Sequence, residues 1–262
     1  MEFVGCVMGQ QTNAIIAGML VLAFANLEKE NYFAAALLIV STGFIKLFGF
    51  GALLLFLFYP KKIKFLSYSF LNGLILFFLP LLVVDFTGLT QIYLNWFGQI
   101  SGDYGEFSGM SIYSFIQSVS GYEVNKMWLL VLSILLMIPA FVQIKKWKIF
   151  EFRLLFLAAL LTWFVAFNHK AESQTYLIAA FGMALWYFSA KRKWPDHILL
   201  GFSFVSLSII FSDLVPYSFR SGFSFHYNIK ALPVTLVWLR ILLEMWMLKP
   251  ISDSPTGSHP AP

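Results

Sequence analysis

Long apolar runs recur along almost the whole chain, from Ala14 to Leu248, and they constrain its fold more than any other feature. Together they leave little sequence for a water-exposed domain of any size. With 59% hydrophobic and 12% charged residues, the composition also lies far outside the range of globular proteins. Soluble enzymes and nucleic-acid-binding modules are therefore excluded.

The apolar runs predict an all-α integral membrane protein, because a bilayer core of about 30 Å needs ~20 helical residues for one crossing. About eight segments are expected, at residues 13–26, 32–59, 65–84, 127–142, 152–167, 175–190, 198–211 and 231–248. We assign residues 1–249 to one multi-pass transmembrane domain with an outer loop at 85–126. Residues 250–262, which are rich in proline and serine, are expected to form a disordered polar tail.

Basic residues gather in alternate connections between the apolar runs. They are Lys61, Lys62, Lys64, Lys145, Lys146, Lys148, Arg153, Lys191, Arg192, Lys193 and Lys249. The positive-inside rule places these connections in the cytoplasm. The intervening connections 85–126, 168–174 and 212–230 then lie outside, or in the lumen for a eukaryotic source. We expect the cytoplasmic (inner) membrane of a bacterium, with the active face extracytoplasmic.

The run at residues 32–59 is unusual because it is too long for one crossing and carries Lys46 at its centre. As one helix it would span about 42 Å. Gly43, Gly49 and Gly51 surround the lysine, which favours two short helices joined at Lys46. This broken or re-entrant helix places Lys46 outside and residues 28–30 in the cytoplasm, whereas a single span reverses the side of residues 28–30.

The outer loop 85–126 is longer than a connector needs. Leu89, Tyr93 and Trp96 belong to a series of apolar residues at three- and four-residue spacing, which predicts an amphipathic helix at 89–100 in the membrane interface. A glycine-rich turn and a second helix at 111–119 follow. Such a loop either closes over a lipid-linked substrate or merely rests on the membrane surface.

The densest polar cluster, residues 168–175, separates two apolar runs on the outer side. His169 and Lys170 suit a phosphate, the lysine as a point charge and the histidine as a hydrogen-bond donor, while Glu172 can orient His169 or accept a proton. The alternative is that the cluster solvates a loop and caps the flanking helices, with Ser173 as an N-cap. His169 and Glu172 lack a second ligand pair, so no metal site is expected.

Other ionisable residues are weaker candidates. Lys46 within an apolar run either faces a cavity, where its charge adds to the anion site, or extends to the membrane surface. Arg220 and His226, on the outer side, either contact a phosphate or sugar or belong to a solvated loop. Arg240 precedes Glu244 by four residues, which predicts an ion pair within one helix.

Several motifs occur in order along the chain: Gln11-Thr12-Asn13, Glu28-Lys29-Glu30, Ile45-Lys46-Leu47-Phe48-Gly49, Tyr59-Pro60-Lys61-Lys62, Phe152-Arg153-Leu154-Leu155-Phe156 and Phe167-Asn168-His169-Lys170-Ala171-Glu172-Ser173. In their order and spacing they resemble glycosyltransferase family 87, whose members are polyprenyl-phosphate-sugar-dependent membrane enzymes. The resemblance covers most of the chain. It implies a GT-C architecture with an outward-facing active site.

The resemblance also implies partners and site residues. The donor is a hexose, often mannose, on a polyprenyl phosphate carrier, and the acceptor is a glycan or glycolipid; membrane lipids surround the protein, and neither a cofactor nor nucleic acid is involved. In such enzymes a carboxylate base assists attack by the acceptor hydroxyl, and cations stabilise the departing phosphate. Taken together with the polar residues described above, this gives His169 and Glu172 as the candidate catalytic residues. The candidate substrate-binding residues are Lys46, Lys170, Asn168, Ser173, Gln11, Asn13 and Arg220.

The family pattern places its carboxylate base in an outer loop that precedes Gln11. We therefore expect the chain to be the C-terminal part of such an enzyme, incomplete because that catalytic loop is missing. Asp85, Asp103, Glu106 and Glu172 remain as possible carboxylates. Two alternatives to an enzyme stay open: a membrane protein that binds or moves a lipid, and a structural partner of another membrane subunit.

Overall fold

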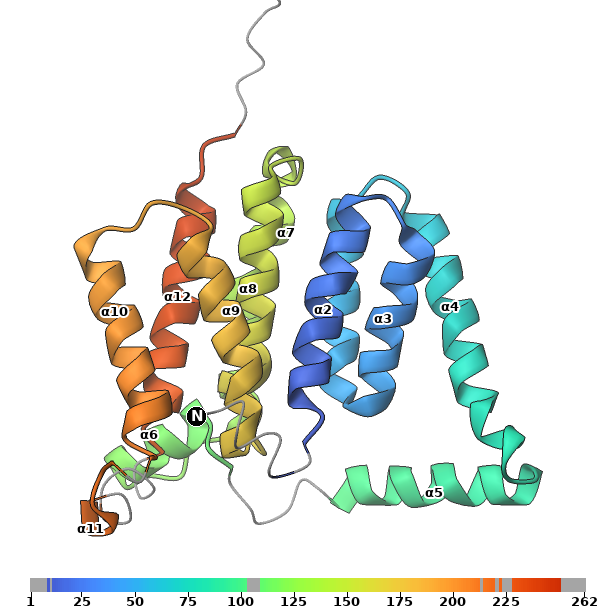
Figure 1. Cartoon of the computed structure of the whole chain (residues 1–262), viewed down its shortest axis with the longest axis horizontal. Coiled ribbons are helices and arrows are strands. Elements are labelled where there is room, and N and C mark those ends of the chain that lie inside the picture. The colour runs from blue at the N-terminus through green and yellow to red at the C-terminus, as the bar shows by residue number, and fades with distance from the viewer. Residues whose placement is uncertain are drawn as a thin grey trace, which may run out of the picture.

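Figure 1 shows a computed structural model of the chain, in which most of the longer helices run alongside one another. The structure describes residues 9, 11–102, 109–212, 214–219, 222 and 228–250. Within those residues every regular element is a helix and none is a strand. The expected all-α fold is thus confirmed for the described part of the chain.

The long helices coincide with the apolar runs of the sequence. They are α2 (Asn13–Glu28), α3 (Tyr32–Ile45), α4 (Lys62–Phe78), α7 (Lys126–Val142), α8 (Phe150–Ala166), α9 (Tyr176–Phe188), α10 (Trp194–Phe204) and α12 (Ala231–Met247). Short 3-10 or π-helical pieces extend or join them, namely η1 (Leu47–Phe58), η2 (Leu79–Leu82), η3 (Ile144–Lys146), η4 (Ser173–Thr175) and η5 (Val205–Ile209).

Fewer of the described helices are long enough to cross a membrane than the sequence predicted. Among the described residues, α4 and η2 together form the one continuous helix, Lys62–Leu82, that is both long and apolar enough to cross a bilayer. The apolar helices α2, α3, η1 and α7 are shorter. The expectation of about eight apolar segments is therefore met by helices at the expected places, most of which fall below the length of a full crossing.

Helix α8 lies at the centre of the fold and packs against α9, α12, α2 and η1. Its sequence is apolar on every side, and such helices are stable only when other elements surround them. From Phe152 to Ala166 nearly all of its residues are buried. Helices from both halves of the chain thus pack around α8. The last residues of α8 lead directly into the polar cluster at 168–175.

The expected break at Lys46 is present. Helix α3 ends at Ile45, Lys46 has an extended backbone with φ −144° and ψ 126°, and η1 runs back beside α3. The close return needs a glycine, because a Cβ on Gly49 would lie 2.6 Å from the backbone carbon of Thr42. The hairpin puts Lys46 at the opposite end of the fold from the connection between α2 and α3.

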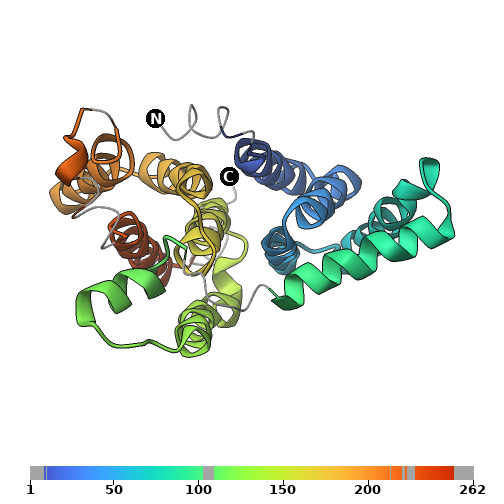
Figure 2. The same ribbon diagram turned by 90° about the horizontal axis from the view of Figure 1, so that it is seen from below.

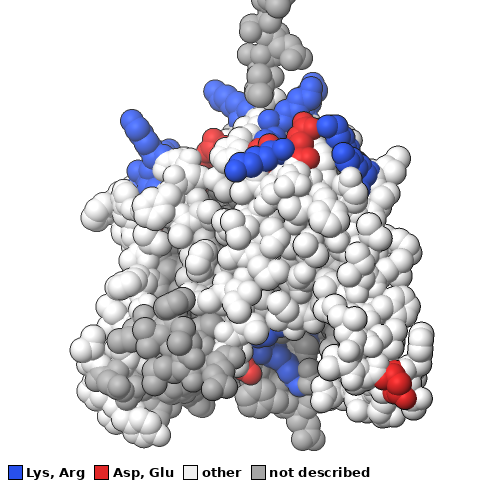
Figure 3. Space-filling view, turned by 45° about the vertical axis from the view of Figure 1, so that its right-hand side comes forward, with Lys and Arg blue, Asp and Glu red and all other residues white. Residues whose placement is uncertain are grey.

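The two ends of the fold differ in charge. Figure 3 shows Lys and Arg gathered at one end, and a smaller basic patch within a hollow at the other end. At the basic end, Arg153 donates two hydrogen bonds to Glu28, at 2.7 and 2.6 Å, and Lys61 pairs with Glu30 at 2.5 Å. Residues 28–30 therefore lie with the basic connections, as the hairpin interpretation requires.

The ion pair predicted within one helix is confirmed, since Arg240 Nη1 lies 3.7 Å from Glu244 Oε2. The sequence did not reveal a second partner of Arg240, whose Nε donates to Asp196 Oδ1 at 2.8 Å. Glu244 also accepts hydrogen bonds from Arg192 Nη1 at 2.8 and 2.9 Å. Because α10 packs against α12, it supplies a carboxylate that spacing along one helix does not reveal.

Helix α5 (Phe86–Gly102) runs across the ends of the other helices rather than alongside them, as Figures 1 and 2 show. It begins where Asp85 Oδ1 accepts a hydrogen bond from Gly88 N–H at 2.8 Å. Tyr93 ties it to α4 by stacking on Phe77, with ring centroids 4.3 Å apart, and by donating its hydroxyl to Phe77 O at 2.8 Å. The helix expected at 89–100 is thus confirmed as a helix.

The remaining elements on the side that the sequence predicts to be outer are short. Helix α6 (Ile112–Ser120) matches the second helix expected at 111–119, and α11 (Tyr217–Phe219) precedes α12. The turn that contains Asp103 and Glu106 lies outside the described residues, and so does the expected tail beyond Pro250.

Candidate functional site

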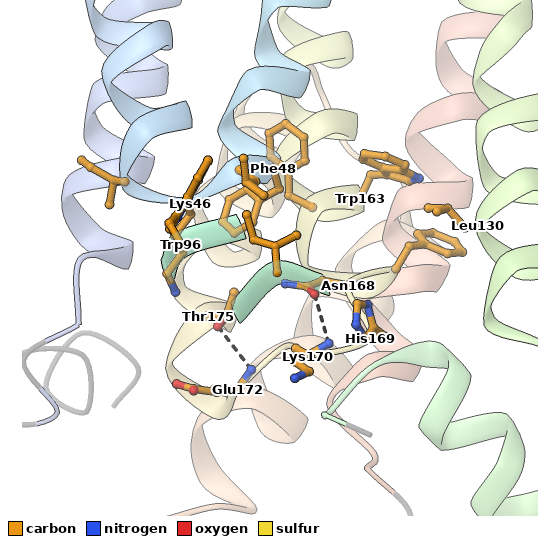
Figure 4. A pocket seen from close by; sticks show the side chains of 15 residues that line it. Lys46, Phe48, Trp96, Leu130, Trp163, Asn168, His169, Lys170, Glu172 and Thr175 are labelled. Carbon is orange, nitrogen blue, oxygen red and sulfur yellow. Dashed lines mark hydrogen bonds between the residues drawn. The ribbon is translucent and has the colours of Figure 1, made fainter. Parts of the chain in front are cut away.

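A cavity of about 690 Å³ lies at the same end of the fold as the tip of the α3–η1 hairpin (Figure 4). The polar residues that line it are Lys46, Asn168, His169, Lys170, Glu172 and Thr175. The apolar ones are Ile45, Leu47, Phe48, Trp96, Ile100, Leu130, Trp163, Phe164 and Phe167. Two segments far apart in the sequence, the hairpin tip and the polar cluster after α8, thus contribute cations to one cavity.

The polar cluster is a turn whose conformation is set by local hydrogen bonds. Asn168 Oδ1 accepts a hydrogen bond from Lys170 N–H at 3.0 Å, which directs the backbone between them. Glu172 is the N-cap residue of η4, and its own N–H donates to Thr175 Oγ1 at 3.3 Å. The capping position expected for Ser173 is therefore taken by Glu172.

A second segment holds this turn from outside. Gly109 N–H donates to His169 O and Met110 N–H donates to Ala171 O, both at 2.6 Å. A side chain does not fit at Gly109, because a Cβ there would lie 2.6 Å from Ala171 O. The chain that returns from the outer loop is thus bound edge to edge against the turn that carries His169 and Lys170.

The start of α2 and the residues before it contact two of the charged side chains of the cavity, Lys46 and Glu172. Asn13 is fully buried, and its Oδ1 accepts a hydrogen bond from Lys46 Nζ at 2.9 Å. Gln11 Nε2 donates to Glu172 Oε2 at 3.1 Å. Neither Gln11 nor Asn13 lines the cavity itself among the residues described. Their position fits groups that orient Lys46 and Glu172 rather than groups that touch a ligand.

Sequence reasoning missed Lys230. This lysine precedes α12, is 1% exposed, and donates from Nζ to Ser173 Oγ at 2.6 Å. Its ammonium also lies 4.4 Å from the ring centroid of Phe211. Ser173, predicted to bind substrate, therefore faces Lys230 rather than the cavity. The one available signal was a lysine placed directly before an apolar helix on the outer side.

The structure does not place several candidates at the cavity. Arg220 and His226 lie outside the described residues. Asp85 begins α5, so its carboxylate has a structural partner. Among the carboxylates in the described ranges, Glu172 is the one that lines the cavity. The described residues also hold no group of three or more His, Cys, Asp or Glu side chains arranged to bind a metal ion.

The cavity has a polar side and an apolar side. Two lysines and a histidine stand against one carboxylate, an arrangement that favours a phosphate because charge-assisted hydrogen bonds to phosphate oxygens are strong. The opposite walls carry aromatic and aliphatic side chains, which favour hydrocarbon. A ligand that joins an anionic group to an apolar chain satisfies both halves.

Comparison with known families explains this combination. The model of glycosyltransferase family 87 matches residues 2–167. The chain belongs to glycosyltransferase family 87. Its members are membrane-bound glycosyltransferases that use polyprenyl-linked sugars, so the resemblance noted in the motifs is confirmed. No curated protein and no solved structure matches the chain significantly.

The family match covers part of the cavity. It includes Lys46 on the hairpin tip, Trp96 on α5 and Trp163 on α8, and it ends at Phe167, directly before the turn with His169. The apolar walls and the first lysine therefore belong to the matched portion of this family 87 chain. The cationic turn follows immediately along the chain.

Proposed function

We propose that this chain transfers a hexose, specifically mannose, from a polyprenyl phosphate carrier to a glycan or glycolipid acceptor outside the cytoplasm. One observation carries the proposal: Lys46 and Lys170, 124 positions apart in the sequence, line a single cavity together with His169 and Glu172. Fixed cations close to a leaving phosphate lower the barrier of glycosyl transfer because they stabilise charge that develops there.

The transfer exchanges one bond at the anomeric carbon for another. The acceptor hydroxyl oxygen attacks that carbon while the bond to the phosphate oxygen breaks, and the phosphate leaves with the electron pair. We assign to Glu172 the acceptance of the hydroxyl proton, since it is the carboxylate of the cavity and Gln11 orients it. Lys46, Lys170 and His169 hold the leaving phosphate.

The distribution of charge supports an extracytoplasmic site. The basic connections that carry Arg153 and Lys61 lie at the end of the fold opposite the cavity (Figure 3). Positive connections are retained in the cytoplasm during membrane insertion. The cavity then opens on the outer leaflet, where α5 lies in the membrane interface.

The test is transfer of radiolabelled mannose from polyprenyl phosphate mannose in membranes that contain the chain, with a nucleotide-linked mannose as the control donor. We expect turnover with the lipid-linked donor alone. Replacing Lys170 with Ala should weaken donor affinity about tenfold or more, because a hydrogen bond to a charged group contributes ~1.5–3 kcal/mol. Lys126→Ala, which removes a lysine that is not among the described residues lining the cavity, is the matched control.

Two results would redirect the proposal. Turnover that appears only when the chain is extended upstream through its reading frame would place the base before Gln11 and leave donor binding to the cavity. Tight binding of polyprenyl phosphate without turnover of any sugar, in either version, would favour the alternative of a protein that binds or moves a lipid. Unchanged donor affinity in Lys170→Ala would remove the cavity from the mechanism.

A further inference from the structure

Helices η1 and α7 meet at the basic end of the fold. Phe58 near the end of η1 stacks on Phe141 of α7, with ring centroids 5.9 Å apart and planes 6° from parallel. Phe156 of α8 fills the space behind them, its ring centroid 4.6 Å from that of Phe58. Aromatic packing therefore closes the seam between η1 and α7 at this end.

At the other end the same two elements lie on different sides of the cavity. Leu47 and Phe48, at the start of η1, and Leu130, near the start of α7, all line it. Trp163 of α8 forms the wall between them and is fixed by a hydrogen bond from its Nε1 to Ser133 Oγ at 2.8 Å. Helices η1 and α7 therefore touch at the basic end, whereas the cavity lies between them at the other end.

This part of the cavity borders exposed apolar side chains of η1 and α7. Leu47 is 43% exposed, and Val131 and Leu132, the neighbours of Leu130 on α7, are 38% and 51% exposed. Figure 4 shows Leu130 and Trp163 on one flank and Lys46 and Trp96 on the other. An apolar passage therefore leads from the cationic turn toward the outer surface of α7.

We propose that the isoprenoid chain of the donor leaves the cavity between η1 and α7, with its first units against Leu47, Phe48 and Leu130. The inference rests on the proposed function, in which Lys46 and Lys170 hold the phosphate. That anchor requires the hydrocarbon to begin beside the hairpin tip and to reach the bilayer without exposing polar groups to lipid. The passage between η1 and α7 meets both requirements, because its lining is apolar and continuous with the phosphate site.

A competing groove lies on the other side of the hairpin. It has a volume of about 480 Å³, runs between α3, η1 and α4, and is lined by residues such as Leu66 and Leu74. Phe44 and Phe50, whose ring centroids lie 5.9 Å apart, belong to this groove and flank the hairpin tip. Lys46 is not among the residues that line it in the described part of the chain. The groove therefore serves as the matched control.

Photo-crosslinking distinguishes the two routes. A photoreactive phenylalanine analogue is placed at Leu130, at Leu47 or at Leu74, and each protein is irradiated with radiolabelled polyprenyl phosphate. We expect labelling from Leu130 and Leu47 that excess unlabelled polyprenyl phosphate suppresses, and only non-competed labelling from Leu74. Competed labelling at Leu74 without labelling at Leu130 and Leu47 would overturn the proposal. Competed labelling at Leu130 without mannose transfer would uphold the passage while the proposed function fails.

Chain length supplies a second, kinetic test. In Leu130→Trp the larger side chain narrows the passage, so the KM for a long-chain donor should rise about tenfold, equivalent to ~1.4 kcal/mol. A short-chain prenyl phosphate mannose, whose chain ends inside the cavity, should keep its KM. Leu74→Trp should change neither value. An equal rise for both donors would mean that Leu130 supports the fold alone, and the proposal would fall.

Discussion

Lys46 Nζ donates a hydrogen bond to Asn13 Oδ1 over 2.9 Å, and this contact joins the tip of the α3–η1 hairpin to the first turn of α2. Asn13 is fully buried, so its amide oxygen is fixed by packing rather than by solvent. The hairpin alone would leave a long lysine side chain with many rotamers. Asn13 selects one of them and directs the ammonium group at the cavity.

The first prediction concerns the charge at this contact. Asn13→Asp changes the side-chain volume little and places a carboxylate next to Lys46. The negative charge of that carboxylate would offset the positive charge of Lys46, so the lysine would attract the donor phosphate less. We expect the KM for the lipid-linked donor to rise about tenfold, since a close opposite charge alters the energy of a buried ion by ~1.4 kcal/mol or more. Donor titration of the initial transfer rate measures this.

Asn13→Leu is the control for that experiment, because it removes the acceptor without adding charge. Its KM should rise less than that of Asn13→Asp. If the leucine variant is impaired as much as the aspartate variant, the effect comes from packing, and the charge of Lys46 has no part in donor binding.

The second prediction concerns the base. Glu172→Gln retains an oxygen that accepts from Gln11 but no longer takes up a proton, so kcat should fall about 100-fold or more while the donor KM stays near its original value. Glu123→Gln replaces an exposed carboxylate with a carboxamide, and this variant should keep the kcat and the donor KM of the unmodified chain. A Glu172→Gln variant with full kcat would exclude this residue as the base.

The third prediction concerns the segment that holds the turn. Gly109→Ala puts a Cβ against the backbone of Lys170 and Ala171, within 2.7 Å of both. The turn must shift, so transfer activity and thermal stability in detergent should both fall, the latter by ~1–3 kcal/mol as for an overpacked core site. Gly98→Ala in α5 meets no atom within 4 Å and should cost nothing. Wild-type activity in Gly109→Ala would show that the backbone bonds to His169 and Ala171 are dispensable.

The fourth prediction concerns the basic end, far from the cavity. Arg153 and Glu28 have side chains 13% and 20% exposed and form a two-pronged hydrogen-bonded pair. Lysine does not reproduce that geometry, so Arg153→Lys should destabilise the protein by about 2 kcal/mol without altering the donor KM. Lys61→Ala, which breaks an ion pair more than half exposed, should leave the unfolding midpoint unchanged. Equal losses in both variants would contradict this account.

The elements of the fold were predictable because they depend on local patterns. The break at Lys46 followed from a run too long for one crossing and from the glycines beside it, and the structure shows it there. The interfacial helix followed from apolar spacing around Tyr93. Neither feature needs knowledge of a distant residue, since helix formation and burial in lipid are read from neighbours along the chain.

Contacts between distant segments were harder to predict from the sequence. The spacing along α12 correctly predicted that Arg240 pairs with Glu244, but the additional pairing of Arg240 with Asp196 was missed because it depends on the packing of α10 against α12. Lys230 was overlooked because nothing near it in the sequence indicates Ser173 as its acceptor. In both cases the contact depends on how elements far apart in the sequence pack together, which no local pattern encodes.

By itself the sequence determined that this chain forms membrane helices, where a hairpin interrupts them and which short turn is polar, because hydrophobicity and length act on each segment separately. The tertiary structure decided that Lys46 and Lys170 line one cavity, that Asn13 and Gln11 contact two of its charged groups, and that α5 contributes Trp96 to its lining. Those relationships exist only after packing, since a cavity is the space that several helices leave between them.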